Sequence, residues 1–248
     1  MDDVIYNGAL NSHKGIMRHS LRRILIGMSV FIAVYLSTVA IWAASSIESI
    51  LARHPVAHAP SLLTPRQSAL LLQIEDPTFR SHHGLSLANG QGATTLTSSL
   101  ARDVFLFRTE LTGVRGTLQA LYRRVFACCK KIDLGRDVTA LVLDAHMSKD
   151  EQLALFVDQV YMGRHQGMQL RGLAQASAAL MGKPLAQLTQ AEFSGLVGMI
   201  RAPNELHPVR NAAAHLQRRA RVQAIGSGAC EPQGWFDTDY AACSAPPG

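Results

Sequence analysis

The sequence predicts a mainly α-helical domain that follows a single membrane-spanning helix. Two observations predict it: an uninterrupted apolar run close to the N-terminus, and three helix-start signals in the chain that follows. A third observation agrees with them, because alternating β-branched runs and Asn-Gly turns are nearly absent.

The apolar run covers residues 24–44 and contains neither a charged residue nor a proline. At about 1.5 Å per residue it spans roughly 31 Å, close to the roughly 30 Å hydrocarbon core of a bilayer. Four basic residues precede it: Lys14, Arg18, Arg22 and Arg23. We therefore predict a cytoplasmic tail over residues 1–23, a single-pass helix in the cell (inner) membrane, and a periplasmic or extracellular C-terminal domain. A cleavable signal peptide is the alternative, and it also exports the rest of the chain.

Residues 45–63 contain Pro55 and Pro60 and little periodicity, which predicts a linker. The helical domain is predicted over residues 64–226, a length that suits one well-buried domain. Its helix starts are capping boxes, in which a Ser or Thr is followed three residues later by Glu or Gln. The pairs are Thr64 with Gln67, Ser148 with Glu151 and Thr189 with Glu192, and a further basic helix is predicted over residues 209–225.

The chain carries a formal net charge of +6, and its basic residues gather between positions 102 and 136. On an exported domain beside a membrane, this strip predicts contact with anionic lipid headgroups or phosphates. A solvated helix face is the alternative. Nucleic acid is excluded as a partner because the compartment is wrong for it.

The four cysteines form two pairs. Cys230 and Cys243 flank a short Gly/Pro/aromatic segment in the C-terminal tail, residues 227–248, and predict a disulfide that staples it. Cys128 and Cys129 are adjacent, so we predict free thiols there. No cysteine spacing typical of a metal site is present, and no metal site is predicted from it.

Residues 75–84 carry the most chemistry in the chain: a carboxylate pair, Glu75-Asp76, at the end of an apolar helix, then an aromatic residue, two histidines and a glycine. A Glu at the mouth of an apolar groove has a raised pKa, which suits proton abstraction from a sugar hydroxyl. On spacing alone, the alternative is that both carboxylates only accept helix-end or arginine contacts.

This segment resembles the first signature of the family 51 glycosyltransferases, the peptidoglycan glycosyltransferases found as monofunctional enzymes and in class A penicillin-binding proteins. The signature E-D-x-x-F-x-x-H-x-G is complete here. Its members are Glu75, Asp76, Phe79, His82 and Gly84. Further matches keep the family's order over roughly residues 65 to 225: Ser148-Lys149-Asp150-Glu151, Gly182-Lys183-Pro184-Leu185, Ala202-Pro203 and Arg218-Arg219.

The resemblance implies a lysozyme-like α-helical domain that polymerises lipid II into glycan strands during cell wall biogenesis. It implies that Glu75 is the general base of an inverting transfer and that Asp76, Phe79, His82 and Gly84 shape the motif. The second signature implies binding of substrate and its pyrophosphate by polar and basic side chains. These are Thr95, Thr97, Ser98, Ser99, Arg102 and Arg108. Other implied partners are the membrane, the growing strand and cell-wall synthesis proteins. A divalent cation, Mg²⁺ or Mn²⁺, is compatible with the pyrophosphate. We expect no transpeptidase domain to follow.

The sequence departs from the family pattern in the second signature and after it. Ser98 and Ser99 replace a glutamine pair. The motif that supplies a second catalytic glutamate is not found; Arg136 falls at that position, and Asp137 beside it is the candidate substitute. The alternatives are therefore a catalytically degenerate relative that binds lipid II or a cell-wall partner, and glycan cleavage with Glu75 acting as an acid.

Residues 111–131 are apolar and basic, which predicts a second contact with the membrane.

Overall fold

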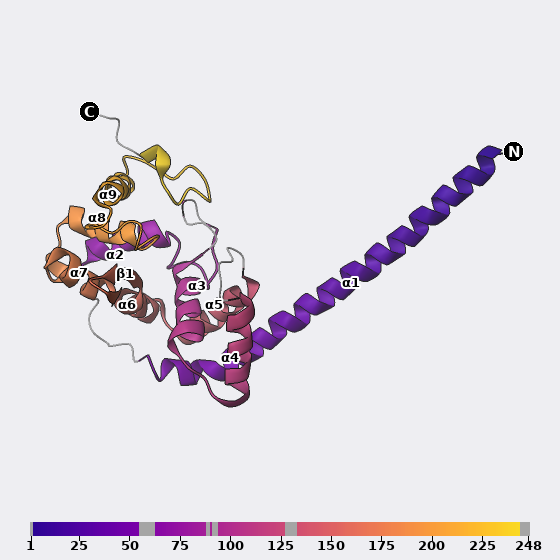
Figure 1. Cartoon of the computed structure of the whole chain (residues 1–248), viewed down its shortest axis with the longest axis horizontal. Helices are drawn as coiled ribbons and strands as arrows, with labels where there is room; N and C mark the ends of the chain where they lie inside the picture. Colours follow the sequence, from indigo (N-terminus) through magenta and orange to yellow (C-terminus); the bar gives the residue numbers. More distant parts are fainter. Residues whose placement is uncertain (1, 55–62, 88–89, 91–93, 127–132, 244–248) are drawn as a thin grey trace.

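The computed structural model describes residues 2–54, 63–87, 90, 94–126 and 133–243. Helices dominate, which confirms the mainly α fold class (Figure 1). The α-helices are α1 (Asp2–Leu51), α2 (Pro65–Glu75), α3 (Leu96–Arg102), α4 (Gly113–Phe126), α5 (Leu134–His146), α6 (Lys149–Gln159), α7 (Leu173–Met181), α8 (Gln190–Met199) and α9 (Ala212–Gly226). A π-helical segment, η1 (Asp103–Arg108), continues α3, and short 3-10 turns lie at η2 (Leu185–Gln187) and η3 (Ala241–Cys243).

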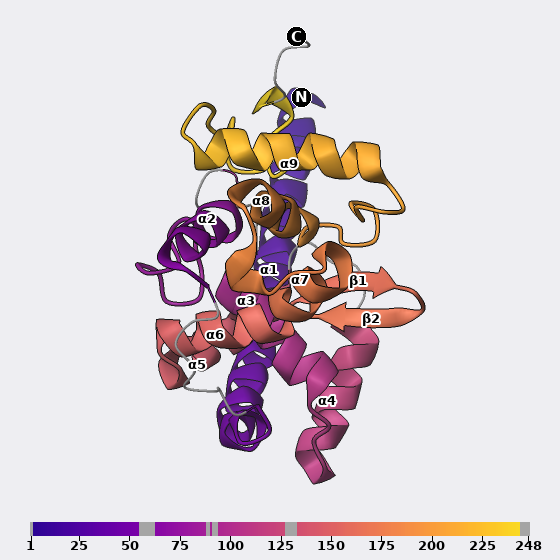
Figure 2. The same ribbon diagram turned by 90° about the vertical axis from the view of Figure 1, so that its left-hand side faces the viewer.

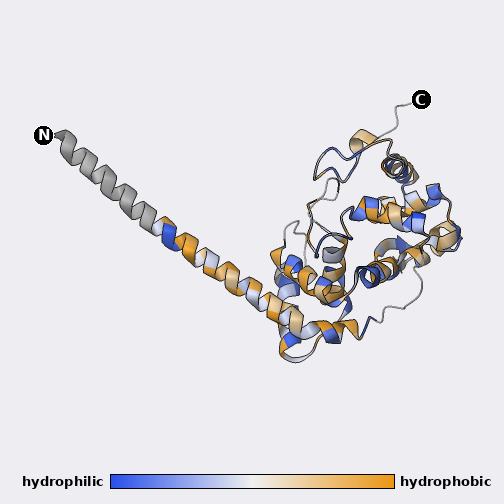
Figure 3. Ribbon diagram, turned by 180° about the vertical axis from the view of Figure 1, so that it is seen from behind, coloured by the Kyte–Doolittle hydropathy of each residue, from blue (hydrophilic) through white to orange (hydrophobic). Residues whose placement is uncertain are grey.

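Helix α1 is 50 residues long and leaves the rest of the protein as a rod (Figure 1). Its segment from Ser20 to Leu51 is long and apolar enough to cross a membrane, by length and composition. Figure 3 shows this segment mostly in the colours of hydrophobic residues. The predicted linker is wrong over residues 45–51, because the helix continues there. Ile47 and Ile50 are fully buried, so their packing against the domain holds these residues helical.

The domain has two hydrophobic cores. The first joins α2, α6, α7, α8 and α9, with Phe79, Phe193 and Leu196 at its centre. The second joins the end of α1 to α3, η1, α4 and α5 through Trp42 and Phe105 among others. Helices α3 and α6 contribute side chains to both cores, and Figure 2 shows them below α8 and α9 and above α4.

All three predicted capping boxes are present, at the starts of α2, α6 and α8. The sequence did not predict the antiparallel hairpin of β1 (Tyr161–His165) and β2 (Met168–Arg171). Its turn residues Gln166 and Gly167 both have positive φ, 50° and 81°, which is the conformation that tight hairpins require. A glutamine at the first of these positions is an uncommon turn residue, so the usual Asn-Gly signal was missing.

Helix α4 covers part of the segment predicted to contact the membrane, and it packs against the end of α1. The indole N–H of Trp42 donates to the carbonyl oxygen of Arg115 at 3.0 Å, and the Arg115 guanidinium donates to the carbonyl of Ser45 at 2.7 Å. An almost wholly apolar cleft of about 270 Å³ lies between the two helices, lined by Phe31, Val39 and Leu121 among others. Cys128 and Cys129 lie outside the described residues, and the membrane contact stays a prediction.

Candidate active site

Glu75 is the last residue of α2 and lines a cavity of about 290 Å³. The helix ends there because Asp76 leaves the helical conformation and Pro77 follows. The buried apolar residues of its wall belong to the first core. The wall is built by residues from seven segments of the chain: Ile74, Glu75, Gly90, Thr94, Thr95, Leu96, Ser99, Phe156, Ile200, Arg201, Arg218, Thr238 and Tyr240.

The neighbouring carboxylates Glu75 and Asp76 have different surroundings. Asp76 is fully buried, and its carboxylate accepts hydrogen bonds from the His82 ring at 2.9 Å and from the Leu96 backbone N–H at 2.8 Å. It therefore ties the first signature to the start of α3. No described residue donates a hydrogen bond to the Glu75 carboxylate. Of the two, only Glu75 is available to a substrate in the cavity.

Burial raises the pKa of Glu75 from its ordinary 4.5 to about 7. The positive charge of Arg218 opposes this shift, Asp76 adds to it, and Arg201 opposes it. Arg218 is itself buried and its Nε has no hydrogen-bond partner in the part of the chain that the structure describes. A carboxylate with a pKa near 7 is suited to exchange protons at neutral pH.

The first signature supports the site. Phe79 is buried in the first core, and the Lys149 ammonium lies 4.7 Å from its ring centroid. His82 holds Asp76, as above. Gly84 has a φ of 93°, and a side chain there would meet the Ala140 backbone at 3.0 Å, so only glycine fits. The Gly84 carbonyl accepts a hydrogen bond from the Thr95 hydroxyl at 2.6 Å.

The second signature forms α3, but the structure brings only part of it to the cavity. Thr95 is the N-cap of α3 and lines the cavity wall. Thr97 and Ser98 are 0% and 1% exposed. Their hydroxyls donate to the Gln152 side chain and to the Thr95 carbonyl, respectively, so both support the helix rather than facing the cavity. Ser99 is exposed and lines the cavity.

A second cavity of about 190 Å³ shares Ser99 and Phe156 with the first and holds Arg102. The Arg102 guanidinium lies 5.4 Å from the centroid of the Phe107 ring. Asp103 also lines this cavity, 3.6 Å from the guanidinium of Arg171, and burial raises the pKa of its carboxyl. Sequence reasoning missed Asp103, although its signal was present: a carboxylate directly after the basic residue of the second signature.

The two remaining predicted residues lie outside both cavity walls. Arg108 ends η1 and has a buried, unpartnered Nη1 among the described residues. Asp137, in the first turn of α5, is held by Arg136, whose Nε and Nη2 lie 3.0 and 2.8 Å from one carboxylate oxygen. Arg136 is almost fully buried and also reaches the Thr94 hydroxyl, 3.3 Å away, at the wall of the Glu75 cavity.

The described residues contain no group of three or more His, Cys, Asp or Glu side chains that could hold a metal ion. Asp103 offers a single carboxylate beside Arg102 in the second cavity. Mg²⁺ is commonly bound through one or two carboxylates together with substrate phosphates, so this residue fits a cation that a pyrophosphate brings with it.

The helical fold and a cavity that holds Glu75 together with Arg201 and Arg218 define a transglycosylase domain. The chain belongs to the transglycosylase family, whose model matches residues 59–225. It is 31% identical over 166 residues to penicillin-binding protein 1B of Escherichia coli, covering 61% of this chain and 18% of that protein. It is 32% identical over 166 residues to penicillin-binding protein 1B of Buchnera aphidicola (61% and 20% covered). It is 30% identical over 219 residues to a Cupriavidus necator protein named "Putative transglycosylase" (80% and 84% covered). The match spans about a fifth of the length of these penicillin-binding proteins.

Proposed function

We propose that this protein is a membrane-anchored peptidoglycan glycosyltransferase that polymerises lipid II into glycan strands. The observation that carries the proposal is the half-buried Glu75 carboxylate, without a hydrogen-bond partner among the described residues, in a cavity that adjoins a second one holding Arg102. Family membership supports the reaction class.

In the proposed reaction, Glu75 takes the proton from the 4-hydroxyl of the acceptor's N-acetylglucosamine. The oxygen then bonds to the anomeric carbon of the growing strand, and the bond from that carbon to the lipid pyrophosphate breaks, with inversion. A pKa near 7 leaves enough carboxylate at neutral pH and keeps it basic enough to accept the proton.

The leaving pyrophosphate needs positive charge and hydrogen-bond donors. Arg102 and Ser99 in the second cavity are our candidates to bind it, because a guanidinium pairs well with phosphate oxygens. A divalent cation, if bound with the pyrophosphate, would neutralise further charge, and Asp103 would contribute a ligand. Thr95 contributes to the wall between the two signatures.

The proposed topology places the N-terminus in the cytoplasm and the helical domain on the outer side of the inner membrane. Lipid II presents its sugars just above the bilayer, so the domain must work at that height. The end of α1 is part of the second core, which fixes the domain directly to the spanning helix. The apolar cleft between α1 and α4 is consistent with the predicted membrane contact.

One observation favours the alternative of a relative that binds lipid II without catalysis. Glu75 is the only carboxylate among the described residues that line its cavity, and Asp137, paired with Arg136, is not part of that wall. The alternative predicts binding of lipid II with no polymer.

Incubation of the purified full-length protein with lipid II separates the two functions. Catalysis predicts glycan polymer from the wild type and none from Glu75→Gln, which keeps the side-chain volume but removes the base. Glu205→Gln, at an exposed glutamate outside both cavity walls, serves as the matched control variant that must still form polymer. Lipid II binding by the wild type without polymer would establish the binding function instead.

A further inference from the structure

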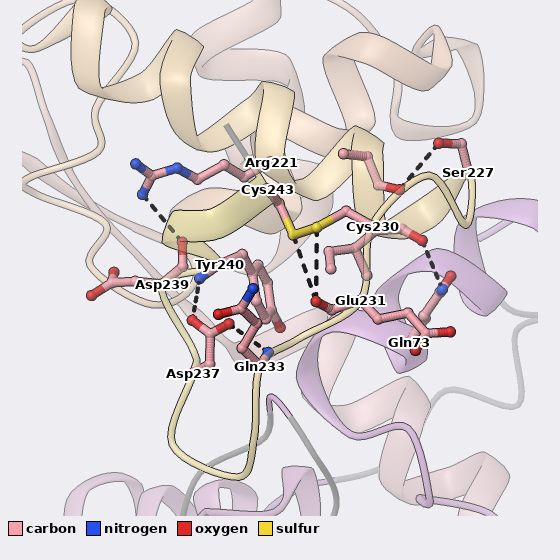
Figure 4. The surroundings of a disulfide bond; sticks show 12 residues. Gln73, Arg221, Ser227, Cys230, Glu231, Gln233, Asp237, Asp239, Tyr240 and Cys243 are labelled. Atoms are coloured by element: carbon pink, nitrogen blue, oxygen red, sulfur yellow. Dashed lines mark hydrogen bonds between the residues drawn. A yellow bond between two sulfur atoms is a disulfide. The ribbon is translucent and has the colours of Figure 1, made fainter. Parts of the chain in front are cut away.

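We propose that the disulfide-closed loop of residues 230–243, here called the tail loop, forms part of the wall of the Glu75 cavity and is required for its activity. The tail loop positions Arg201 and Arg218 beside Glu75. This proposal deepens the proposed function and rests on it. The tail loop follows α9 and is joined by a disulfide between Cys230 and Cys243, whose Cα atoms are 5.6 Å apart (Figure 4). Two of its residues, Thr238 and Tyr240, line the cavity.

Three successive tail-loop residues hold the two arginines. The Thr238 carbonyl accepts a hydrogen bond from the Arg218 guanidinium at 2.9 Å. The Asp239 carboxylate forms an ion pair with Arg201. The Arg218 guanidinium lies over the Tyr240 ring, 4.6 Å from its centroid. Both arginines lower the pKa of Glu75, so the tail loop acts on the carboxylate through them.

The tail loop also fixes the other side of the cavity. The Tyr240 hydroxyl donates to the carbonyl oxygen of Ile74, the residue before Glu75, at 3.1 Å, and lies 3.3 Å from that of Gly90. The Gly90 N–H donates to the Gly234 carbonyl at 3.0 Å. A side chain at Gly90 would meet Pro232 at 2.6 Å, so the contact requires glycine. The tail loop thus covers Gly90, which lies between the two signatures.

The disulfide is needed because the tail loop has little core of its own. Its buried residues are Tyr240 and Cys243, whereas Phe236 is 70% exposed. Tyr240 has a φ of 53°, a conformation that a tyrosine rarely adopts and that its surroundings must enforce. Asp237 contributes by accepting the Tyr240 N–H at 3.0 Å (Figure 4). Opening the disulfide removes the covalent closure of this segment, so it frees the two arginines and exposes the half-buried Glu75 to more water.

The two arginines have a defined effect on Glu75. Their charges lower its pKa, so a neutral residue at position 218 raises it. Opening the tail loop acts in two opposing ways: release of the arginines raises the pKa, and hydration of Glu75 lowers it. Arg218→Gln therefore tests the effect of the arginine charge by itself.

The test uses full-length protein in the Cys128→Ser/Cys129→Ser background, so that a reductant acts on the Cys230–Cys243 bond alone. We expect dithiothreitol to lower kcat for polymerisation at pH 7 at least about tenfold, because small displacements of catalytic groups have effects of that size or larger. Cys230→Ser/Cys243→Ser should show the same loss without reductant and no further change with it. The acid limb of the rate profile should move to higher pH in Arg218→Gln, because loss of that positive charge raises the pKa of Glu75.

Hydrogen exchange gives a readout that does not depend on activity. The amide of Gly90 should lose protection on reduction, while the amides of α9 (Ala212–Gly226) keep theirs. Unchanged protection of Gly90, or unchanged kcat with the disulfide open, overturns the proposal. If Gly90 loses protection but the oxidised enzyme makes no polymer either, the proposed function fails and the tail loop keeps only its role in closing the cavity.

Discussion

Glu75 and Asp76 are adjacent in the chain and have the same charged group, yet their surroundings give them different tasks. The Asp76 carboxylate accepts hydrogen bonds from the His82 ring and the Leu96 N–H, and these bonds connect the first signature to the second. Glu75 faces the cavity without a hydrogen-bond donor among the described residues, and burial raises its pKa. The pair resembles other acid–base sites in which two neighbouring carboxyls are separated in role by environment.

The raised pKa of Glu75 predicts a stability change with pH. The folded state holds the proton more tightly than the unfolded chain, so between pH 4.5 and about 7 the wild type loses stability as pH rises. The loss is complete above pH 7 and is on the order of 3 kcal/mol. Glu75→Gln removes it. We expect the variant to melt higher than the wild type at pH 8 and equally at pH 4.5; an equal difference at both pH values would contradict the raised pKa.

Asp103 and Asp137 are the two candidates for a second functional carboxylate beside Glu75, and replacing each by asparagine gives a matched comparison. Asp103 lines the cavity with Arg102, whereas Asp137 is paired with Arg136 outside both cavity walls. We expect Asp103→Asn to lower kcat/KM for lipid II about tenfold or more, which is about 1.4 kcal/mol of transition-state stabilisation, and Asp137→Asn to lower it much less. A loss in Asp137→Asn as complete as in Glu75→Gln would restore Asp137 as the second catalytic residue.

Local sequence predicted Glu75 and its supporting motif, because helix end, carboxylate and glycine turn lie within ten residues. It placed Thr97 and Ser98 among substrate-binding residues, but whether a helical side chain faces a cavity depends on what packs around the helix. Arg201, Arg218 and Tyr240 were not predicted as site residues. They reach Glu75 from more than 120 positions away, and only the packing of α8, α9 and the tail loop brings them there.

At the scale of elements, the helix starts were predictable because a capping box is formed by four consecutive residues. The end of α1 was not, because the composition of residues 45–51 does not show that Ile47 and Ile50 will be buried against other helices. The π-helical η1 likewise gives no clear sequence signal. It continues α3 from Asp103 to Arg108 and so sets where Asp103 and Arg108 face.

The junction of α1 and α4 depends on Trp42, which is 4% exposed, contacts Phe105 and donates to the Arg115 carbonyl. Truncation of a buried tryptophan costs about 3–5 kcal/mol. We expect Trp42→Ala to lower the melting temperature of the domain by about 10 °C and to raise hydrogen exchange in α4. Its neighbour Ile41 is 70% exposed, so Ile41→Ala is the control. Equal effects of the two variants would contradict a structural junction.

At the scale of the whole molecule, the two hydrophobic cores support different parts of the protein. The first core includes α2, which ends at Glu75, and the second includes the end of α1. Helices α3 and α6 contribute to both cores and line both cavities. Helix α1, which is long and apolar enough to cross a membrane, is therefore also part of the domain that holds the site.

This arrangement predicts the result of truncation. A chain that begins at residue 52 loses Trp42, Ala43, Ile47 and Ile50 from the second core. We expect it to lack a cooperative thermal transition in detergent, whereas a chain that begins at residue 20 keeps the transition of the full protein. Cooperative unfolding of the shorter chain at an unchanged temperature would show that α1 is only a tether.

The pH dependence of lipid II polymerisation tests most directly whether Glu75 is the general base. The deprotonated carboxylate is the active form, so kcat/KM should rise tenfold per pH unit at low pH and level off near pH 7, where Glu75 titrates. Residual activity in Glu75→Gln should lack this limb. A rate that is flat from pH 5 to 8, or a limb that survives in Glu75→Gln, would contradict the account.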